Sequence, residues 1–307
     1  MTPARTSLSP TEQRHPATED IDTVGTIEVL RRINREDHVA VDAVAEVLPR
    51  LADVVDLAAE RFRRGGTVHY FGAGTSGRLG VLDASELMPT YNLPPGRVVG
   101  HIAGGSDALV RAVEDAEDSA AEGRRDAAGL GPDDVAIGLA ASGSTPYVGG
   151  ALEAARAAGA YTVLVSSNPG APLAAGVDTD IVLRTGPEVV TGSTRLKAGT
   201  AQKLVLNGFS TALMIAVGRT FGNLMVSVVA TNAKLRERTV RILQEATGVA
   251  EAEARILLER CDGDLKTAIV VALAAADPAP ARHALARTDG SVRAALAELD
   301  GHGGAGS

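Results

Sequence analysis

Short apolar segments alternate with helical segments from residue 68 to residue 218, and this alternation limits how the 307-residue chain can fold. The five apolar segments lie at 68–71, 98–102, 135–141, 162–166 and 181–184. They are apolar at almost every position, which is typical of parallel strands that are buried on both faces. Strands of this kind, separated by helices, predict an α/β fold with a five-stranded parallel sheet between layers of helices.

Helices are expected on both sides of these strands. Apolar residues recur at three- and four-residue intervals from Ile21 to Arg64, where Gly65 and Gly66 end the pattern. Further helices are expected at 107–125, 146–158 and 196–218. After Gly222 only helical patterns remain, and they predict a small bundle of three or four helices at 240–246, 251–260, 265–275 and 292–299.

These patterns predict three parts of the chain. An N-terminal arm with helices covers 1–57, a sheet domain covers 58–221, and a C-terminal helical region covers 222–307. The C-terminal region resembles a ubiquitin-associated bundle, which favours either a lid and dimer-packing role or a partner-binding module.

The composition restricts the partners and the compartment. A net charge of −8 and an aromatic content of 3% argue against a nucleic-acid interface or an anionic membrane surface. The single Cys261 excludes an intrachain disulfide and fits a reducing compartment. No signal-peptide pattern and no apolar run of roughly 20 residues is found. We therefore expect a cytoplasmic protein with no membrane partner.

The first predicted strand leads into a glycine-rich loop, 72–78, that matches G-x-G-x-x-G. A dinucleotide site would need an acidic residue about 20 positions on, at the end of the second strand. That strand ends in Ala103-Gly104-Gly105 and carries no carboxylate there. A P-loop is excluded because Arg78 stands where the Lys-Ser/Thr pair should begin.

A phosphate-binding turn explains this loop better. Its hydroxyl residues Thr75 and Ser76 lie at the start of a predicted helix, where backbone N–H groups attract anions. A second loop of the same kind follows the third strand, and Pro146 fits the first position of the next helix. The alternative is that these hydroxyls only cap helices, but two such loops after two parallel strands favour phosphate binding. The hydroxyl residues of the second loop are Ser142, Ser144 and Thr145.

The candidate acid–base groups are carboxylates. Glu86 lies on the helix that starts at the first loop, and Glu114 to Asp118 form an acidic cluster on the helix expected at 107–125. Each of them has the simpler explanation of an exposed acidic helix face. The six histidines show no spacing typical of metal ligands, so no metal site is expected, and His69 is read as a core histidine.

Several segments together resemble one family, the N-acetylmuramic acid 6-phosphate etherases. They are 72–80, 83–86, 114–118, 191–203, 221–225 and 231–235, and the resemblance extends from about residue 22 to residue 299. It implies a sugar isomerase (SIS) domain with a doubly wound five-stranded parallel sheet, no cofactor, and a homodimer with shared active sites. The partner it implies is a small sugar phosphate.

The resemblance also implies roles for individual residues. Glu86 matches the family's acid and Glu117 its base, with Glu114 close by. Thr75, Ser76, Ser142, Ser144 and Thr145 match positions near the phosphosugar. Asn232 and Lys234 match positions that the related glucokinase regulatory protein uses for its sugar phosphate. Leu87-Met88 replaces a Cys-Pro that the family often has after the acid, and His15 replaces an asparagine in the N-terminal arm.

The reaction implied is removal of the C2 proton, elimination of lactate from C3, and addition of water at C3. Two alternatives stay open. A non-catalytic phosphosugar-sensing regulator would need the phosphate loops but not both carboxylates. An aldose–ketose sugar phosphate isomerase on the same fold would release no lactate.

Overall fold

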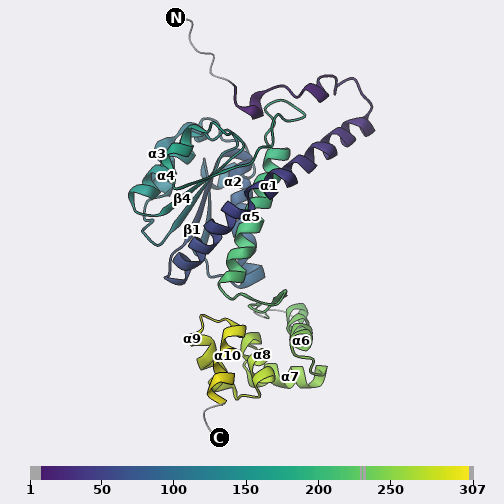
Figure 1. The fold of residues 1–307 in the computed structure, drawn as a ribbon, viewed down its shortest axis with the longest axis vertical. Coiled ribbons are helices and arrows are strands. Elements are labelled where there is room, and N and C mark those ends of the chain that lie inside the picture. The colour runs from purple at the N-terminus through teal and green to yellow at the C-terminus, as the bar shows by residue number, and fades with distance from the viewer. Residues whose placement is uncertain (1–7, 229, 231–232, 304–307) are drawn as a thin grey trace, which may run out of the picture. The chain divides into compact units, whose positions relative to one another are not determined.

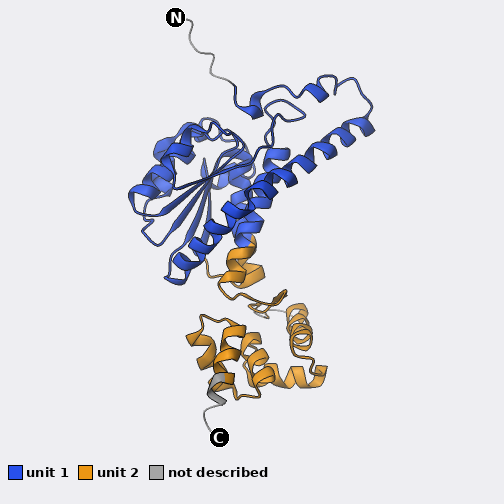
Figure 2. Ribbon diagram, in the orientation of Figure 1, with its two compact units in different colours: residues 1–85, 96–210 blue, residues 86–95, 211–307 orange. Residues whose placement is uncertain are grey.

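The computed structural model describes residues 8–228, 230 and 233–303 (Figure 1). They form two compact units, which Figure 2 colours separately. The first unit contains residues 1–85 and 96–210, and the second contains residues 86–95 and 211–307. Among the described helices, none is both long enough and apolar enough to cross a membrane.

The first unit is built on a five-stranded sheet with all strands parallel, as predicted. The strand order is β2-β1-β3-β4-β5, so β1 lies between β2 and β3. Apolar side chains of the strands are buried because helices cover the sheet, and every residue of β3 is buried. The strands are β1 Val68–Gly72, β2 Val98–Ile102, β3 Val135–Leu139, β4 Tyr161–Ser166 and β5 Thr179–Val182.

Helices cover both faces of this sheet, which confirms the predicted doubly wound arrangement. Figure 1 shows α3 Ala120–Asp126 and α4 Pro146–Ala157 on one face. The other face carries α1 Thr26–Arg63, α2 Gly74–Tyr91 and α5 Lys197–Ala216. A glycine allows α3 to pack closely against α4. A Cβ at Gly123 on α3 would lie 1.9 Å from the carbonyl oxygen of Tyr147 on α4.

The helix expected at 107–125 is wrong for most of its length. The chain forms a 3₁₀ turn at Gly105–Leu109, an irregular segment, a second 3₁₀ turn at Ala116–Asp118 and only then α3. Asp115 adopts a left-handed conformation with a φ of 60°, which interrupts a right-handed helix. Ser119 then caps α3, because its side chain accepts a hydrogen bond from the N–H of Glu122.

The second unit is helical apart from one short antiparallel hairpin, β6 Thr220–Phe221 and β7 Leu224–Met225. The prediction of helices only after Gly222 is therefore wrong at β7. The described residues contain five helices rather than three or four: α6 Ala233–Thr247, α7 Glu251–Arg260, α8 Leu265–Ala274, α9 Pro278–Arg287 and α10 Val292–Gly303. The prediction missed α9, whose prolines read as helix breakers; Pro278 stands at the first helical position, where proline is accommodated.

A buried carboxylate joins β1, α2 and α5 in the first unit. Asp83 is 4% exposed and accepts hydrogen bonds from Tyr70 Oη at 3.0 Å, Asn207 Nδ2 at 2.6 Å and Ser210 Oγ at 3.0 Å. Burial raises the pKa of this carboxyl above its ordinary value. Asp83 thus accepts from two buried hydroxyls, of Tyr70 and Ser210, and from one half-buried amide, of Asn207.

We expect Asp83→Ala to lower the free energy of unfolding by about 3 kcal/mol, because it removes the acceptor of two buried hydroxyls, of Tyr70 and Ser210, and of the half-buried amide of Asn207. Urea denaturation measures this loss. Asp53→Ala, at an exposed position of α1, is the matched control and should change stability little. A loss for Asp83→Ala no larger than that of the control would show that the network contributes nothing to stability.

Candidate active site

The loops after β1 and β3 lie next to each other. These two strands pair in parallel, and Gly72 at the end of β1 is opposite Leu139 at the end of β3. The chain runs from β1 to β2 on one side and then to β3 on the other, so the strand order reverses here. Ligands of doubly wound sheets bind in the crevice at this reversal, at the carboxyl ends of the strands.

The first loop leads directly into α2. Gly74, with a φ of 52°, begins the helix, and Thr75 and Ser76 follow in its first turn, both half-buried. A Cβ at Gly77 would lie 2.6 Å from the carbonyl oxygen of Gly72, so this turn is too tight for a larger residue. The first N–H groups of a helix have no partner within it and are available to an anion.

A buried amide on α5 holds one of these hydroxyls. Ser76 Oγ donates to Gln202 Oε1 at 2.8 Å, and Gln202 is 1% exposed. Gln202 Nε2 is buried without a hydrogen-bond partner among the described residues. One end of the amide therefore orients Ser76, and the other end is an unused donor beside the loop.

The second loop is held by hydrogen bonds of its own. Ser142 Oγ accepts from the N–H of Ser144 at 3.3 Å and from Ser144 Oγ at 2.9 Å. Asn168, just after β4, donates from Nδ2 to the carbonyl oxygen of Ser142 at 3.0 Å. Thr145 is the N-cap residue of α4, but its hydroxyl makes no capping bond. The capping alternative thus does not account for Thr145, whose hydroxyl remains available to a ligand.

The acidic cluster lies on a loop and not on a helix. Glu117 is exposed on the 3₁₀ turn Ala116–Asp118, and Glu114 is exposed in the irregular segment before it. Arg78 on α2 anchors the start of this segment, because its Nε donates to the carbonyl oxygen of Leu109 and its Nη2 to that of Arg111, both at 3.1 Å. No pattern in the sequence indicates this anchoring role.

We expect Arg78→Gln to lower kcat about tenfold with little change in KM, because two hydrogen bonds that anchor the segment leading to Glu117 are lost. Steady-state kinetics with the sugar phosphate that the sequence resemblance implies measures both constants. Arg124→Gln is the matched control, since Arg124 pairs with Glu153 Oε2 at 2.8 Å on the exposed surface of α3 and α4. An increase in KM alone would instead place Arg78 in substrate binding.

The remaining predicted site residues belong to the second unit or lie outside the described residues. Glu86 is exposed on α2, ten residues after Ser76, and a rise of about 1.5 Å per residue separates the two by about 15 Å along the helix axis. Lys234 is exposed in the first turn of α6. Asn232 lies outside the described residues. The first unit alone therefore contains Glu117 and the two loops with hydroxyl residues, 72–78 and 142–145, which we call the hydroxyl loops. It does not contain all of the predicted site residues.

Two histidines pair within the sheet and not at the site. His69 Nδ1 lies 2.9 Å from His101 Nε2, and His69 Nε2 lies 2.9 Å from Thr67 Oγ1. Burial, together with His101, lowers the pKa of His69 to about 4, so it is neutral near pH 7. Both ring nitrogens of His69 thus have partners, and its side chain is half-buried in the sheet. Within the described ranges, no three His, Cys, Asp or Glu side chains gather as a metal site would require.

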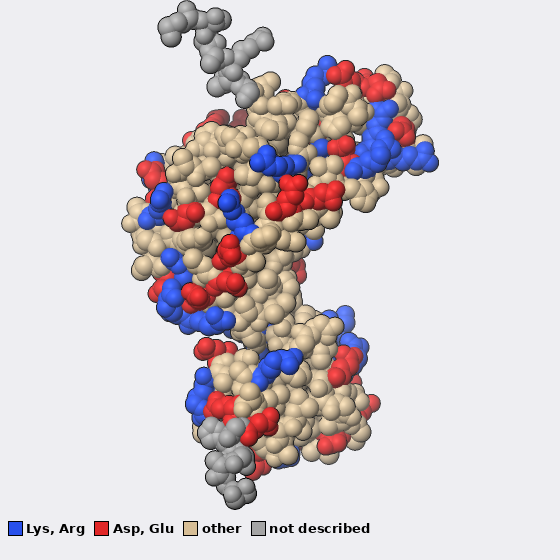
Figure 3. All heavy atoms as spheres, in the orientation of Figure 1, with Lys and Arg blue, Asp and Glu red and all other residues tan. Residues whose placement is uncertain are grey.

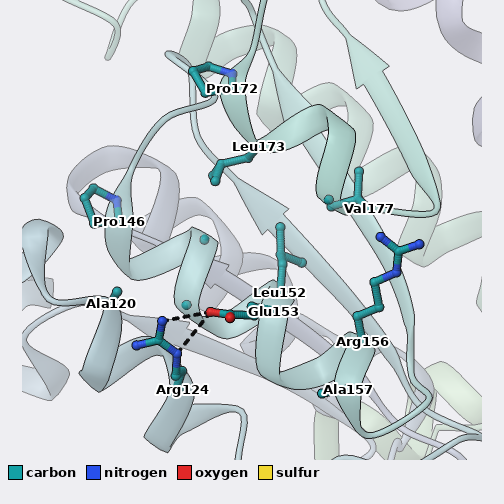
Figure 4. A pocket seen from close by; sticks show the side chains of 13 residues that line it. Ala120, Arg124, Pro146, Leu152, Glu153, Arg156, Ala157, Pro172, Leu173 and Val177 are labelled. Atoms are coloured by element: carbon teal, nitrogen blue, oxygen red, sulfur yellow. Dashed lines mark hydrogen bonds and ion pairs between the residues drawn. The ribbon is translucent and has the colours of Figure 1, made fainter.

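A cavity of about 700 Å³ lies elsewhere on the first unit, between α4 and its neighbours (Figure 4). Leu152, Leu173 and Val177 make its wall largely apolar, and Arg124 pairs with Glu153 at its edge. None of the predicted site residues lines it. Positive and negative side chains are interspersed over much of the face shown in Figure 3.

Part of the chain is similar to a known domain family and to solved structures. Residues 50–156 match the family model described as the glucokinase regulatory protein N-terminal SIS domain. A solved phosphoheptose isomerase from Francisella tularensis is similar at 19% identity and a TM-score of 0.49, over 62% of this chain and 98% of that one.

Two curated relatives carry the same name, N-acetylmuramic acid 6-phosphate etherase. The protein from Thermobifida fusca (strain YX) is 56% identical over 271 residues, which are 88% of this chain and 89% of the relative. The protein from Aliivibrio fischeri (strain MJ11) is 51% identical over 290 residues, which are 94% of this chain and 97% of the relative. Identity at this level over nearly the full length leaves one assignment: the chain belongs to the N-acetylmuramic acid 6-phosphate etherase family.

Proposed function

We propose that this protein is a carbon–oxygen lyase that cleaves the D-lactyl ether of N-acetylmuramic acid 6-phosphate. The products are N-acetylglucosamine 6-phosphate and D-lactate. The observation that carries this proposal is the identity of 51% to 56%, over nearly the full chain, to relatives named as etherases of this substrate. The sugar phosphate fits a sheet whose two adjacent loops present hydroxyls and helix N-termini.

The phosphate is the anchor of the substrate in this proposal. Helix α2 and helix α4 both begin at the strand-order reversal, so their N-terminal N–H groups supply two sets of donors for one dianion. Side-chain hydroxyls add further donors. We assign this anchoring to Thr75, Ser76, Ser142, Ser144 and Thr145, and we propose that Asn232 and Lys234 also bind the sugar phosphate.

The chemistry requires a base and an acid. In the open-chain sugar the C1 aldehyde acidifies the C2 proton, and Glu117 removes it to give an enolate. The enolate forms a C2–C3 double bond as the C3–O bond breaks, and Glu86 protonates the departing lactate oxygen. Water then adds to C3 as Glu86 takes a proton from it, and Glu117 returns a proton to C2, which restores both carboxyl groups.

We further propose a homodimer with shared active sites. Helix α1 exposes apolar side chains along its length, with Ile27 60%, Leu30 57%, Val41 53% and Leu48 52% exposed. Positions 27, 41 and 48 differ by multiples of seven, which places them on one face of the helix, as in a helix–helix interface. A second copy of α1 would cover this face, whose N-terminal part extends beyond the sheet in Figure 1.

The length of α2 supports sharing of the sites. The roughly 15 Å between Ser76 and Glu86 along the axis exceeds the reach from the phosphate to C3 of one hexosamine 6-phosphate. A twofold dimer can instead supply Glu86 and Lys234 from the partner subunit, and symmetry then completes both sites.

The free Cys261 thiol and the phosphorylated substrate support a cytoplasmic location.

The purified protein incubated with N-acetylmuramic acid 6-phosphate should release D-lactate, which an enzymatic lactate assay measures. Release of lactate excludes both alternatives, since a sensor turns nothing over and an aldose–ketose isomerase forms no lactate. Binding without lactate would favour the regulator.

We also expect the activity to survive an excess of EDTA, because the proposed steps use carboxylates and no metal ion. Lactate release is compared before and after chelation and gel filtration. Loss of turnover that a divalent cation restores would overturn this metal-free mechanism.

A further inference from the structure

The hydroxyl of Ser76 gives its one hydrogen to a buried amide and not to the crevice. Ser76 Oγ donates to Gln202 Oε1 at 2.8 Å. With that hydrogen in use, Ser76 can only accept a hydrogen bond from a ligand. A phosphate dianion carries no hydrogen to donate, so Ser76 in this arrangement cannot hydrogen-bond to a phosphate.

Helix α5 places Gln202 against the first hydroxyl loop. A Cβ at Gly199, three residues before Gln202, would lie 3.5 Å from Thr75 Cγ2, so this part of α5 packs directly against the loop. Gln202 is 1% exposed, and its Nε2 is buried without a hydrogen-bond partner among the described residues. Buried N–H groups without an acceptor are rare and unfavourable in folded proteins.

A half-turn of the Gln202 amide about its last side-chain bond would exchange its two ends. The oxygen and nitrogen ends are of similar size, so the turned side chain fills nearly the same space. Nε2 then donates to Ser76 Oγ, and the hydrogen of Ser76 becomes free for a ligand. Each orientation makes one hydrogen bond to Ser76, and Nε2 has no other bond to lose among the described residues. A ligand that interacts with only one of two such states selects it.

On the basis of the sugar-phosphate site in the proposed function, we propose that a phosphorylated ligand turns the Gln202 amide, so that Nε2 donates to Ser76 Oγ and Ser76 donates its hydrogen to a phosphate oxygen. Gln202 is then a positioning residue that acts through Ser76 and does not itself contact the substrate. A hydroxyl that accepts one hydrogen bond donates a stronger one, because successive hydrogen bonds polarise each other.

Nuclear magnetic resonance of the Gln202 amide tests the turn directly. The chain has only three glutamines, at 13, 202 and 244, so ¹⁵N in the glutamine side chains labels three amide groups. N-acetylglucosamine 6-phosphate should move one Nε2 proton of Gln202 downfield, because that proton gains a hydrogen bond to Ser76 Oγ. The amide of Gln13, which is exposed and already donates to the carbonyl oxygen of Leu8 at 3.0 Å, is the internal control and should not move.

Inorganic phosphate and unphosphorylated N-acetylglucosamine are the matched arms. Phosphate should reproduce the shift because it supplies the anion alone, and N-acetylglucosamine should not. A shift with N-acetylglucosamine as large as that with its 6-phosphate would assign the Ser76 hydroxyl to the sugar and overturn the proposal. An unshifted Gln202 amide at a saturating concentration of the 6-phosphate would overturn it, as would a protein that binds neither phosphorylated ligand.

A double-mutant cycle tests whether Gln202 acts through Ser76. Gln202→Met keeps the length of the side chain and removes the amide, so the Kd of N-acetylglucosamine 6-phosphate should rise about tenfold, the size of one hydrogen bond. In the Ser76→Ala background the same change should have no further effect. An equal rise in both backgrounds would show a merely structural role. The amide shift should also be absent from Ser76→Ala protein, and a shift that survives there would contradict the proposal even if Gln202→Met does not fold.

Lactate release separates this proposal from the proposed function. Wild-type protein that binds the 6-phosphate but releases no lactate from N-acetylmuramic acid 6-phosphate would contradict the proposed function alone, and the amide shift would still decide the role of Gln202. In the active enzyme, Gln202→Met should raise KM about tenfold with kcat nearly unchanged, because the phosphate is bound equally before and during the reaction. A fall in kcat with an unchanged KM would contradict a role in phosphate binding.

Discussion

Glu117→Gln should abolish exchange of the C2 proton of N-acetylmuramic acid 6-phosphate with solvent, with a loss of at least about 10²-fold, typical of a general base. The amide keeps the size of the side chain on the exposed 3₁₀ turn Ala116–Asp118, so folding should be preserved. Deuterium incorporation at C2 in D₂O, followed by NMR, measures the exchange directly and separately from lactate release.

Two further variants separate the roles of the carboxylates. Glu86→Gln should stop lactate release more severely than exchange, because the acid acts after the proton has left C2. Glu114→Gln should be mild, since Glu114 is an exposed residue of the same segment. The reverse pattern for Glu86 and Glu117 would exchange their roles, and a deep loss for Glu114→Gln would assign the base to Glu114.

Mixing two inactive proteins should restore activity if sites are shared. Glu117→Gln and Lys234→Ala subunits, exchanged at equal concentrations, pair at random, and about half of the dimers are then mixed. In each mixed dimer one site carries both changes and the other carries neither. Lactate release should therefore recover to about a quarter of the wild-type rate.

Native mass spectrometry confirms that the subunits have exchanged. Each protein mixed with itself is the control and should recover no activity. Exchange without recovered lactate release would contradict the shared site, because a site built within one chain always keeps one of the two changes.

The sheet could be predicted from the sequence because its strands are apolar at nearly every position. β2 lies where it was predicted, at 98–102, and β1, β3 and β4 agree to within a few residues. The prediction of a helix at 107–125 was wrong because the periodicity of this segment is compatible with a helix, whereas the left-handed conformation of Asp115 interrupts one. An aspartate tolerates that conformation, but nothing in the local sequence requires it. At α9, Pro278 and Pro280 concealed a helix whose first turn accommodates both.

The hydroxyl loops were predicted because they follow strands directly, and the structure places both beside the strand-order reversal. The side chains that hold these loops by hydrogen bonds were not predicted, since each comes from a distant part of the chain. Gln202 reaches Ser76 across 126 positions, and Asn168 reaches Ser142 across 26. The catalytic roles of Glu86 and Glu117 and the contributions of Asn232 and Lys234 stay predictions, as does the division at residues 58 and 222.

The second unit is built from two separate stretches of the chain, and this has a consequence for its synthesis. Residues 86–95 leave the ribosome early, but residues 211–307, which belong to the same unit, are made last. Leu87, Tyr91 and Leu93 are buried in the finished protein, so this segment cannot reach its final environment until translation is almost complete. In the nascent chain these three side chains lack the part of their unit that residues 211–307 form, so we expect a chaperone that shields apolar segments to bind there during elongation.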